Sequence, residues 1–228
     1  MKRSIKEGLI RIVILMIGLT IAHLGVTLFL VSNLGSDPFN VFVQGTCHSL
    51  SAAFHWQALT HGRVHIVISL LIILILLAVD RNYVKIGTIL CMVCGGPFID
   101  GFTFLLGPML GQVTALPLRI LMLAIGCVIL AFGMTIVIRS DAGTGPNDLV
   151  AVVISDKLHK RFSVIRIIVD ATFIVIGFLL GGVAGIGTLI CMLLVGPVAG
   201  IFLPINGRQI DKIIARTCGQ VGQEKNRE

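Results

Sequence analysis

The sequence predicts an all-α, polytopic membrane protein built from two homologous halves. Its composition indicates a bilayer environment, since 56% of its 228 residues are hydrophobic, only 13% are charged and the mean hydropathy is +1.01. A soluble domain needs far more polar surface than this composition supplies. Two further observations, a set of long apolar runs and a polar octapeptide that occurs twice, predict the helices and the duplication.

Six apolar runs each reach or approach the roughly 20 residues that a helix needs to cross hydrocarbon. They cover residues 9–32, 64–79, 86–110, 118–138, 163–181 and 183–205. The sequence lacks the polar and apolar alternation of a membrane β-barrel, so helices are expected to satisfy the backbone hydrogen bonds. The basic start resembles a secretory signal, but the first apolar run is too long for one, and we interpret it as the first membrane helix.

The octapeptide NLGSDPFN at 33–40 aligns with DAGTGPND at 141–148 when the chain is shifted by 108 positions. At a shift of 100 positions, GTILCMVCGGP at 87–97 aligns with GTLICMLLVGP at 187–197. Ordered matches of Gly, Pro, Thr and Arg rarely arise by chance among apolar segments, so this pattern predicts an internal repeat. We expect three parts in the chain: a first membrane repeat at 1–110, a second at 111–206, and a cytoplasmic, amphipathic and charged tail at 207–228.

Each half is predicted to contain one short helix, at about 37–53 and 145–158, and the second is too short to cross the membrane core. If neither crosses, each half has three spans and the two halves insert in opposite directions as an inverted repeat. The basic loops and both termini then share the cytoplasmic side, as positive-inside bias favours. If both short helices cross, the protein has eight transmembrane helices and parallel repeats, and the sequence leaves this alternative open.

The octapeptides place polar residues where the short helices begin. Ser36 and Thr144 are expected as N-caps, and Pro38 and Pro146 suit the first helical turn. Exposed helix N-termini attract polar or anionic groups, and broken helices of inverted-repeat transporters use them at the substrate site. The predicted substrate-binding residues of these two segments are Ser36, Asp37, Asn40, Gln44, Thr144, Asn147 and Asp148. The alternative is that both are ordinary capped turns at the membrane surface.

Ionisable residues within the apolar runs are the other candidates. Asp170 and Asp100 are predicted to bind substrate, because a carboxylate in hydrocarbon costs several kcal/mol unless it faces a partner or a water path. His23 and Asp170 are predicted to couple a proton. The alternatives are an Asp170 that is neutralised by burial or paired with Arg166, and a His23 that is a satisfied interior histidine.

Glycine and proline residues at corresponding places in the two halves predict breaks or hinges. They are Gly35, Pro38, Gly96, Pro97, Gly143, Pro146, Gly196 and Pro197. Glycine also lets membrane helices pack closely, so static packing remains an alternative for several of them.

The sequence contains no Walker loop, no HExxH and no GxSxG, and its one CxxC, at Cys91 and Cys94, has no second pair to complete a metal set. We therefore expect no enzyme activity, no cofactor and no metal. The net charge of +7 gathers at the termini and near 157–161, which indicates membrane orientation rather than nucleic-acid binding. The expected partners are the lipid bilayer, an unknown small-molecule ligand and possibly a second copy of the chain in a homo-oligomer.

The segments LGSDPFNVFVQGTCHSLS and GTILCMVCGGPFIDGF resemble the YczE/YyaS/YitT family of bacterial integral membrane proteins, most closely the YczE-like branch. The matching positions are Leu34, Gly35, Pro38, Gly45, Gly87, Thr88, Gly96, Ile99 and Asp100. The sequence departs from the family pattern at Phe39 and Asn40, where the family has Trp-Asp, and at Cys91, where it has Asn. The resemblance implies a multi-spanning protein of the bacterial cytoplasmic membrane and names no substrate.

Two functions follow from these patterns. The first is a small secondary transporter or permease for a small polar or charged solute, with alternating exposure of a site between the halves. The second is a non-transporting accessory factor that supports other envelope or biosynthetic proteins, in which the duplication is only architectural.

Overall fold

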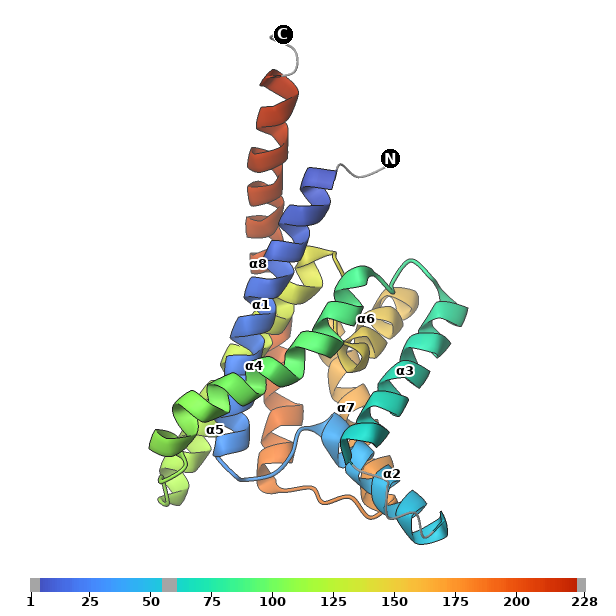
Figure 1. Cartoon of the computed structure of the whole chain (residues 1–228), viewed down its shortest axis with the longest axis vertical. Helices are drawn as coiled ribbons and strands as arrows, with labels where there is room; N and C mark the ends of the chain where they lie inside the picture. Colours follow the sequence, from blue (N-terminus) through green and yellow to red (C-terminus); the bar gives the residue numbers. More distant parts are fainter. Residues whose placement is uncertain (1–4, 55–60, 225–228) are drawn as a thin grey trace.

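The computed structural model describes residues 5–54 and 61–224, and within these ranges the chain forms helices and no strands. There are eight helices in the described ranges, coloured along the chain in Figure 1. Their bounds are α1 (Ile5–Val31), α2 (Pro38–Phe54), α3 (His61–Val79), α4 (Ile86–Leu110), α5 (Leu116–Ser140), α6 (Pro146–Leu158), α7 (Phe162–Leu179) and α8 (Ile186–Glu224).

Six of these helices are long and apolar enough to cross a membrane, namely α1, α3, α4, α5, α7 and α8. The two remaining helices, α2 with 17 residues and α6 with 13, do not qualify. The all-α class and the six spans predicted from the apolar runs are therefore confirmed, and the eight-span alternative is wrong. Both short helices begin within a residue of their predicted starts, because Pro38 and Pro146 occupy their first positions.

The six long helices alternate in direction. In Figure 1, α1 begins and α8 ends at the same end of the molecule, which we call the terminus side; we call the opposite end the far side. Helices α1, α4 and α7 run toward the far side, and α3, α5 and α8 run back. The helices at corresponding places in the two predicted halves, α1 with α5, α3 with α7 and α4 with α8, therefore run in opposite directions.

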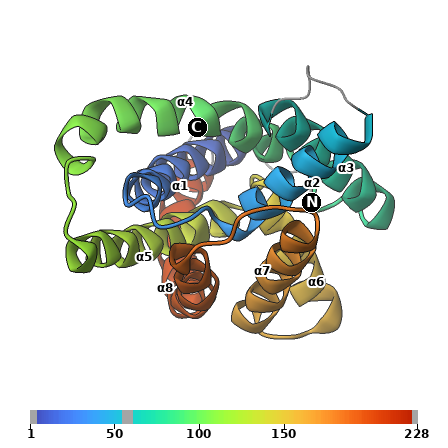
Figure 2. The same cartoon turned by 90° about the horizontal axis from the view of Figure 1, so that it is seen from below.

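The centre of the bundle is the pair α1 and α5, which approach each other through glycine (Figure 2). A Cβ on Gly25 would lie 2.3 Å from the backbone nitrogen of Leu130, and a Cβ on Gly133 would lie 2.3 Å from that of Ala22. Only glycine permits backbones this close, which is the usual packing device between membrane helices. The two contacts are reciprocal, since Gly25 and Gly133 are related by the shift of 108.

Helix α8 packs on α5 and α7, whereas α4 lies along one edge of the bundle and packs chiefly on α1 (Figure 2). Pro97 and Pro197 both lie inside continuous helices, α4 and α8. The chain does not break at residue 206, because α8 continues through Glu224 and its last turns extend beyond the rest of the bundle (Figure 1). The predicted tail is thus an extension of the last span as far as it is described.

Candidate functional site

The two octapeptides form loops of the same shape. Asn33 and Asp141 have φ values of 53° and 55°, and Gly35 and Gly143 have φ values of 148° and 136°. These last values are strained for any residue with a side chain, which explains the two glycines. Each loop turns the chain back from the end of a spanning helix and starts a short helix.

Each loop is held by the opposite half of the chain. The Gly187 amide donates to Leu34 O, and the Gly87 amide donates to Ala142 O, both at 2.9 Å. Arg119 Nε donates to Ser32 O at 2.7 Å, and in the same way Arg11 donates to Ser140 O at 3.0 Å. The loop of one half therefore packs on the last helix of the other half, and every contact in this set has a counterpart.

The predicted N-caps are wrong by one residue. Asp37, not Ser36, caps α2, because its Oδ1 accepts a hydrogen bond from the Asn40 amide at 3.2 Å. Gly145 occupies the cap position of α6 and makes no side-chain cap, so Thr144 lies one residue before it. The reason is that proline starts both helices and the residue directly before it becomes the cap.

A buried ion cluster joins α6 to α7. Arg166 Nε donates to Asp170 Oδ2 at 2.9 Å, and a second guanidinium nitrogen donates to Asp148 in the first turn of α6. The Asp170 side chain is only 2% exposed and that of Arg166 is 9% exposed. Buried charges of this kind persist only when paired and hydrogen-bonded. The alternative in which Asp170 pairs with Arg166 is therefore the observed arrangement, and the structure adds Asp148 as a second partner.

The corresponding place in the first half holds a neutral contact. His61 Nε2 lies 3.2 Å from Asn40 Oδ1, and Asn40 also donates to the Asp37 carboxylate. Asn40 and Asp148 are related by the shift of 108, so the spanning helix that follows each short helix touches its first turn at the same position.

Several predicted site residues lie away from this cluster. Asp100 is exposed on α4, where it faces outward from the bundle. His23 is half-buried, with Nδ1 2.7 Å from Leu19 O in its own helix and Nε2 against Gly95 of α4. This is the position that the alternative interpretation, a satisfied interior histidine, expects. Ser36 accepts a hydrogen bond through its carbonyl from Thr188 Oγ1 at 2.6 Å, and Asn147 is half-buried in the first turn of α6.

On the far side, the loop at 180–185 packs against α2 and is hydrogen-bonded to it. Ser49 Oγ donates to Leu180 O at 2.9 Å, His48 Nδ1 lies 2.9 Å from Gly181 O, and the Val183 amide donates to Gln44 Oε1 at 3.0 Å. Beside these bonds, α2 and α7 touch backbone to backbone, since a Cβ on Gly45 would lie 2.1 Å from Gly177 O. We call this set of contacts the far-side seal.

On the terminus side, the corresponding elements, the 80–85 loop and α6, line a cavity of about 600 Å³ together with residues of α1, α5, α7 and α8. Its lining runs from exposed residues at the rim to buried ones inside, and includes Lys85, Arg139, Thr144, Leu149, Asp156 and Asp211. Tyr83 and Asp156 share a hydrogen bond across the rim, and desolvation together with the negative charge of Asp156 raises the pKa of the Tyr83 phenol. Asp80 and Lys157 form a weak ion pair beside it at 4.0 Å.

Two buried hydroxyls near the inner end of this cavity have no hydrogen-bond partner among the described residues, Thr88 Oγ1 and Thr144 Oγ1. Thr188, which corresponds to Thr88, both donates to Ser36 O and accepts from the Gly185 amide. The two corresponding threonines therefore differ. The Thr188 hydroxyl is hydrogen-bonded beneath the far-side seal, and the Thr88 hydroxyl beside the cavity has no partner among the described residues.

Sequence reasoning missed the cavity residues Lys85, Arg139 and Asp211, because they lie in or near loops and in the helix beyond the apolar runs. It treated Arg166 only as an alternative partner of Asp170. The available signal was that a cation inside an apolar run requires an acidic partner on another helix as well as on its own. Among the described residues, no group of three or more His, Cys, Asp or Glu side chains is placed to hold a metal ion.

A bundle of six membrane-length helices, with two short helices that begin beside a buried ion cluster, defines a multi-spanning helical membrane protein. Its sequence from residue 9 to 204 matches the profile of a family of unknown function, DUF6198, and the chain belongs to that family.

The relatives extend over most of the chain. It is 30% identical over 205 residues to the uncharacterized membrane protein YczE of Bacillus subtilis, with 90% of each chain covered. It is also 30% identical over 195 residues to an uncharacterized protein of Haemophilus influenzae, covering 86% of this chain and 84% of the relative. The similarity to the uncharacterized protein YyaS of Bacillus subtilis is 26% over 190 residues, covering 83% and 90%. The resemblance drawn from the sequence motifs is therefore confirmed. No solved structure matches this chain.

Proposed function

We propose that the protein is a small secondary transporter, or permease, for a small polar or charged solute. The observation that carries this proposal is the difference between its two sides. A cavity leads from the terminus side to the start of α6, while the corresponding elements on the far side are closed by three hydrogen bonds and a backbone contact. A protein whose site is open to one face and sealed from the other has the geometry of one state of an alternating-access cycle.

The second state of the proposed cycle follows from contacts that occur in pairs, one in each half of the chain. Corresponding helices run in opposite directions, and the paired contacts of Gly25 with Gly133, and of Arg11 with Arg119, support an inverted repeat with a pseudo-twofold axis between α1 and α5. Exchange of the two conformations between the halves produces a state that is closed at the terminus side and open at the far side. The same kinds of contact hold both states, so their free energies are similar enough for a ligand to shift the population.

The distribution of basic residues supports a cytoplasmic position for the terminus side in a bacterial cytoplasmic membrane. Lys and Arg concentrate before and within the start of α1 and in the last part of α8, at Lys2, Arg3, Lys6, Arg11, Arg208, Lys212 and Arg216. Short segments rich in these residues stay cytoplasmic. In this orientation, the cavity opens to the cytoplasm.

The ion cluster connects α6 to α7, and α6 is the helix that must move to close the cavity. Arg166 ties the first turn of α6 to α7, so any displacement of α6 that closes the cavity must keep or exchange its bond to Asp148. Asp170 shares Arg166 with that bond, and we assign coupling-ion or substrate contact to it.

Cysteine accessibility tests the proposal without knowledge of the substrate. Val41 is fully buried beneath the far-side seal, and Val152 lines the cavity. Val41→Cys and Val152→Cys are made separately after the half-buried Cys47, Cys94 and Cys218 are replaced by Ser or Ala. Each variant is reconstituted in liposomes and treated with a membrane-impermeant maleimide on one side at a time.

Alternating access predicts that Val152→Cys reacts from the terminus side and that Val41→Cys reacts, more slowly, from the far side. The parent protein without an introduced cysteine measures the background from the remaining buried cysteines. If Val41→Cys never reacts while Val152→Cys does, the far side does not open, and the accessory-factor function takes the place of transport.

A further inference from the structure

We propose that the cavity on the terminus side binds a small zwitterion with an apolar body, such as an α-amino acid. This inference rests on the proposed function, because it names the class of solute for that site. It follows from which charged and polar groups of the cavity are already paired, and which are left for a ligand.

The first step is the balance of charge around the cavity. Lys85 donates to the carboxylate and carbonyl of Asp141, and Arg11 bonds Glu7 and lies 3.8 Å from the same Asp141. Asp156 shares a hydrogen bond with Tyr83. These groups neutralise or satisfy one another inside the protein, so they hold the walls of the cavity together rather than recruit a ligand.

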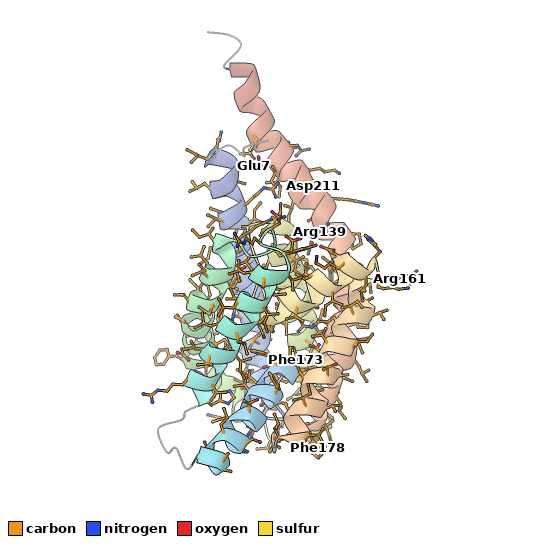
Figure 3. All side chains as sticks on the ribbon, turned by 90° about the vertical axis from the view of Figure 1, so that its right-hand side faces the viewer. Glu7, Arg139, Arg161, Phe173, Phe178 and Asp211 are labelled. Atoms are coloured by element: carbon orange, nitrogen blue, oxygen red, sulfur yellow. The ribbon has the colours of Figure 1, made fainter. Side chains whose placement is uncertain are left out.

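In the described part of the chain, three charged groups of the lining remain without an opposite charge beside them: Asp156, which keeps only its contact with the uncharged Tyr83, and the oppositely charged Arg139 and Asp211. Among the described residues, Asp211 of α8 has no ion-pair partner, and the only bond of Arg139 runs from its Nε to Leu203 O at 3.0 Å. The remaining guanidinium nitrogens of Arg139 are free to donate to a carboxylate, and the carboxylate of Asp211 is free to accept from an ammonium group. Arg139 touches α8 at Gly207, one turn before Asp211, and Asp211 lies closer to the terminus-side end of the molecule than Arg139 in Figure 3. A ligand with one group of each sign satisfies both.

The inner end of the cavity offers a further polar contact. Thr144 is 3% exposed, its hydroxyl has no partner among the described residues, and it lines the cavity directly before the uncapped N-terminus of α6. A buried hydroxyl without a partner costs free energy that a bound ligand recovers. The positive end of α6 favours the carboxylate of the ligand over its ammonium group at this position.

Part of the remaining wall is apolar. Besides the polar Asn82, Tyr83 and Ser155, the cavity is lined by Ile138, Leu149, Val152, Phe162 and Leu203. Burial of an aliphatic or aromatic side chain against them contributes about 25 cal/mol for each Å² of apolar surface removed from water. A purely ionic solute leaves this wall unused, which favours a zwitterion with an apolar side chain.

The test measures thermal unfolding of the purified full-length protein in detergent with millimolar amounts of each standard amino acid. Each amino acid that raises Tm is compared with its two singly charged analogues; for L-leucine, these are isocaproate, which lacks the amine, and isoamylamine, which lacks the carboxylate. Because a ligand that binds only the folded state must raise its stability, the zwitterion is expected to raise Tm by several degrees and both analogues by much less.

Three variants assign the contacts. Arg139→Gln and Asp211→Asn are each expected to abolish the shift given by the zwitterion, and Asp211→Glu to retain part of it. Arg208→Gln, an exposed arginine on α8 outside the cavity lining, is the matched control and keeps the full shift. The four variants lie at three exposed positions, so the Tm of the ligand-free protein is expected to stay unchanged at Asp211 and Arg208 and to fall slightly for Arg139→Gln, which loses its bond to Leu203 O.

An equal shift with isocaproate or with isoamylamine overturns the zwitterion class and identifies a singly charged solute. No shift with any amino acid also overturns it. Neither result bears on transport itself, because far-side opening is measured independently by labelling of Val41→Cys, which needs no ligand.

Discussion

At the scale of single residues, the candidate site is defined by charged side chains that are buried away from water. Arg166 is nearly buried and serves two carboxylates, Asp148 on α6 and Asp170 on its own helix. Removal of one partner of a buried ion pair leaves an uncompensated charge, and this costs more than the pair itself contributes. Replacement of each of the three residues is therefore expected to lower the free energy of unfolding by a different amount.

Arg166→Gln is expected to lower the free energy of unfolding by about 3–5 kcal/mol, since it leaves the buried Asp170 and the partly buried Asp148 without a cation. Asp170→Asn is expected to cost less, because Arg166 keeps Asp148. The double variant is expected to be more stable than Arg166→Gln alone. Chemical unfolding in detergent measures all three, with exposed Asp211→Asn as a control that changes nothing; equal losses for both single variants would contradict this account of the cluster.

Thr88 and Thr188 provide a second comparison at this scale, because both side chains are fully buried. Thr188→Val deprives Ser36 O of its donor and is expected to cost about 1–3 kcal/mol. Thr88→Val removes an unpartnered hydroxyl of similar shape and is expected to be neutral or stabilising. Thermal unfolding of the two variants decides this, and a larger loss for Thr88→Val would indicate that its hydroxyl has a ligand or water partner.

At the scale of helices, the structure depends on two kinds of contact. The pair α1 and α5 is fixed by glycines 108 positions apart in the sequence, while α4 packs on α1 through side chains such as Cys91 and leaves Gly101 open. At Gly101 an added Cβ would meet nothing within 4 Å, whereas at Gly133 it would meet the backbone of Ala22. The same substitution at these two sites therefore separates close packing from helix propensity.

Gly133→Ala is expected to destabilise the protein by about 1–3 kcal/mol through overpacking. Gly101→Ala is the matched control and is expected to cause no loss, because alanine favours the helix and the space is open. Thermal unfolding and gel filtration in detergent compare the two. Similar tolerance at both positions would mean that α1 and α5 can separate without penalty.

At the scale of the whole molecule, the two sides differ although their elements correspond. The 180–185 loop is bonded to α2 by three hydrogen bonds, whereas the corresponding 80–85 loop contacts α6 beside the cavity through Tyr83 with Asp156 and the weak pair of Asp80 with Lys157. Gly45 and Gly177 bring backbones together at the first site, while Leu76, Leu149 and Val153 pack α3 against α6 through side chains at the second. Under the proposed function, this asymmetry corresponds to one state of an alternating-access cycle.

The far-side seal should open more often when its hydrogen bonds are removed. Gln44→Met with Ser49→Ala deletes two bonds of about 0.5–1.5 kcal/mol each, so the rate at which Val41→Cys reacts from the far side is expected to rise about tenfold. Thr46→Ala is the control, because its hydroxyl bonds only Phe42 O within α2. An unchanged rate in the double variant, with the control also unchanged, would show that these bonds do not hold the far side closed.

The sequence by itself determined the elements of this protein. Apolar runs of sufficient length specify spanning helices wherever they occur, and Pro38 and Pro146 fix the starts of the short helices through local backbone restrictions. It also identified Asp170 and Asp100 as unusual, because a charge inside an apolar segment is costly in any fold.

Only the tertiary structure decided which of those charges meet. Membrane helices are apolar on all sides, so their sequence pattern does not specify which face packs inward. For that reason Asp100 and Asp170, both carboxylates within spanning helices, could not be told apart until one proved exposed and the other buried against Arg166. The closed far side and the open cavity are likewise properties of packing between distant segments, and nearly identical local motifs produced both.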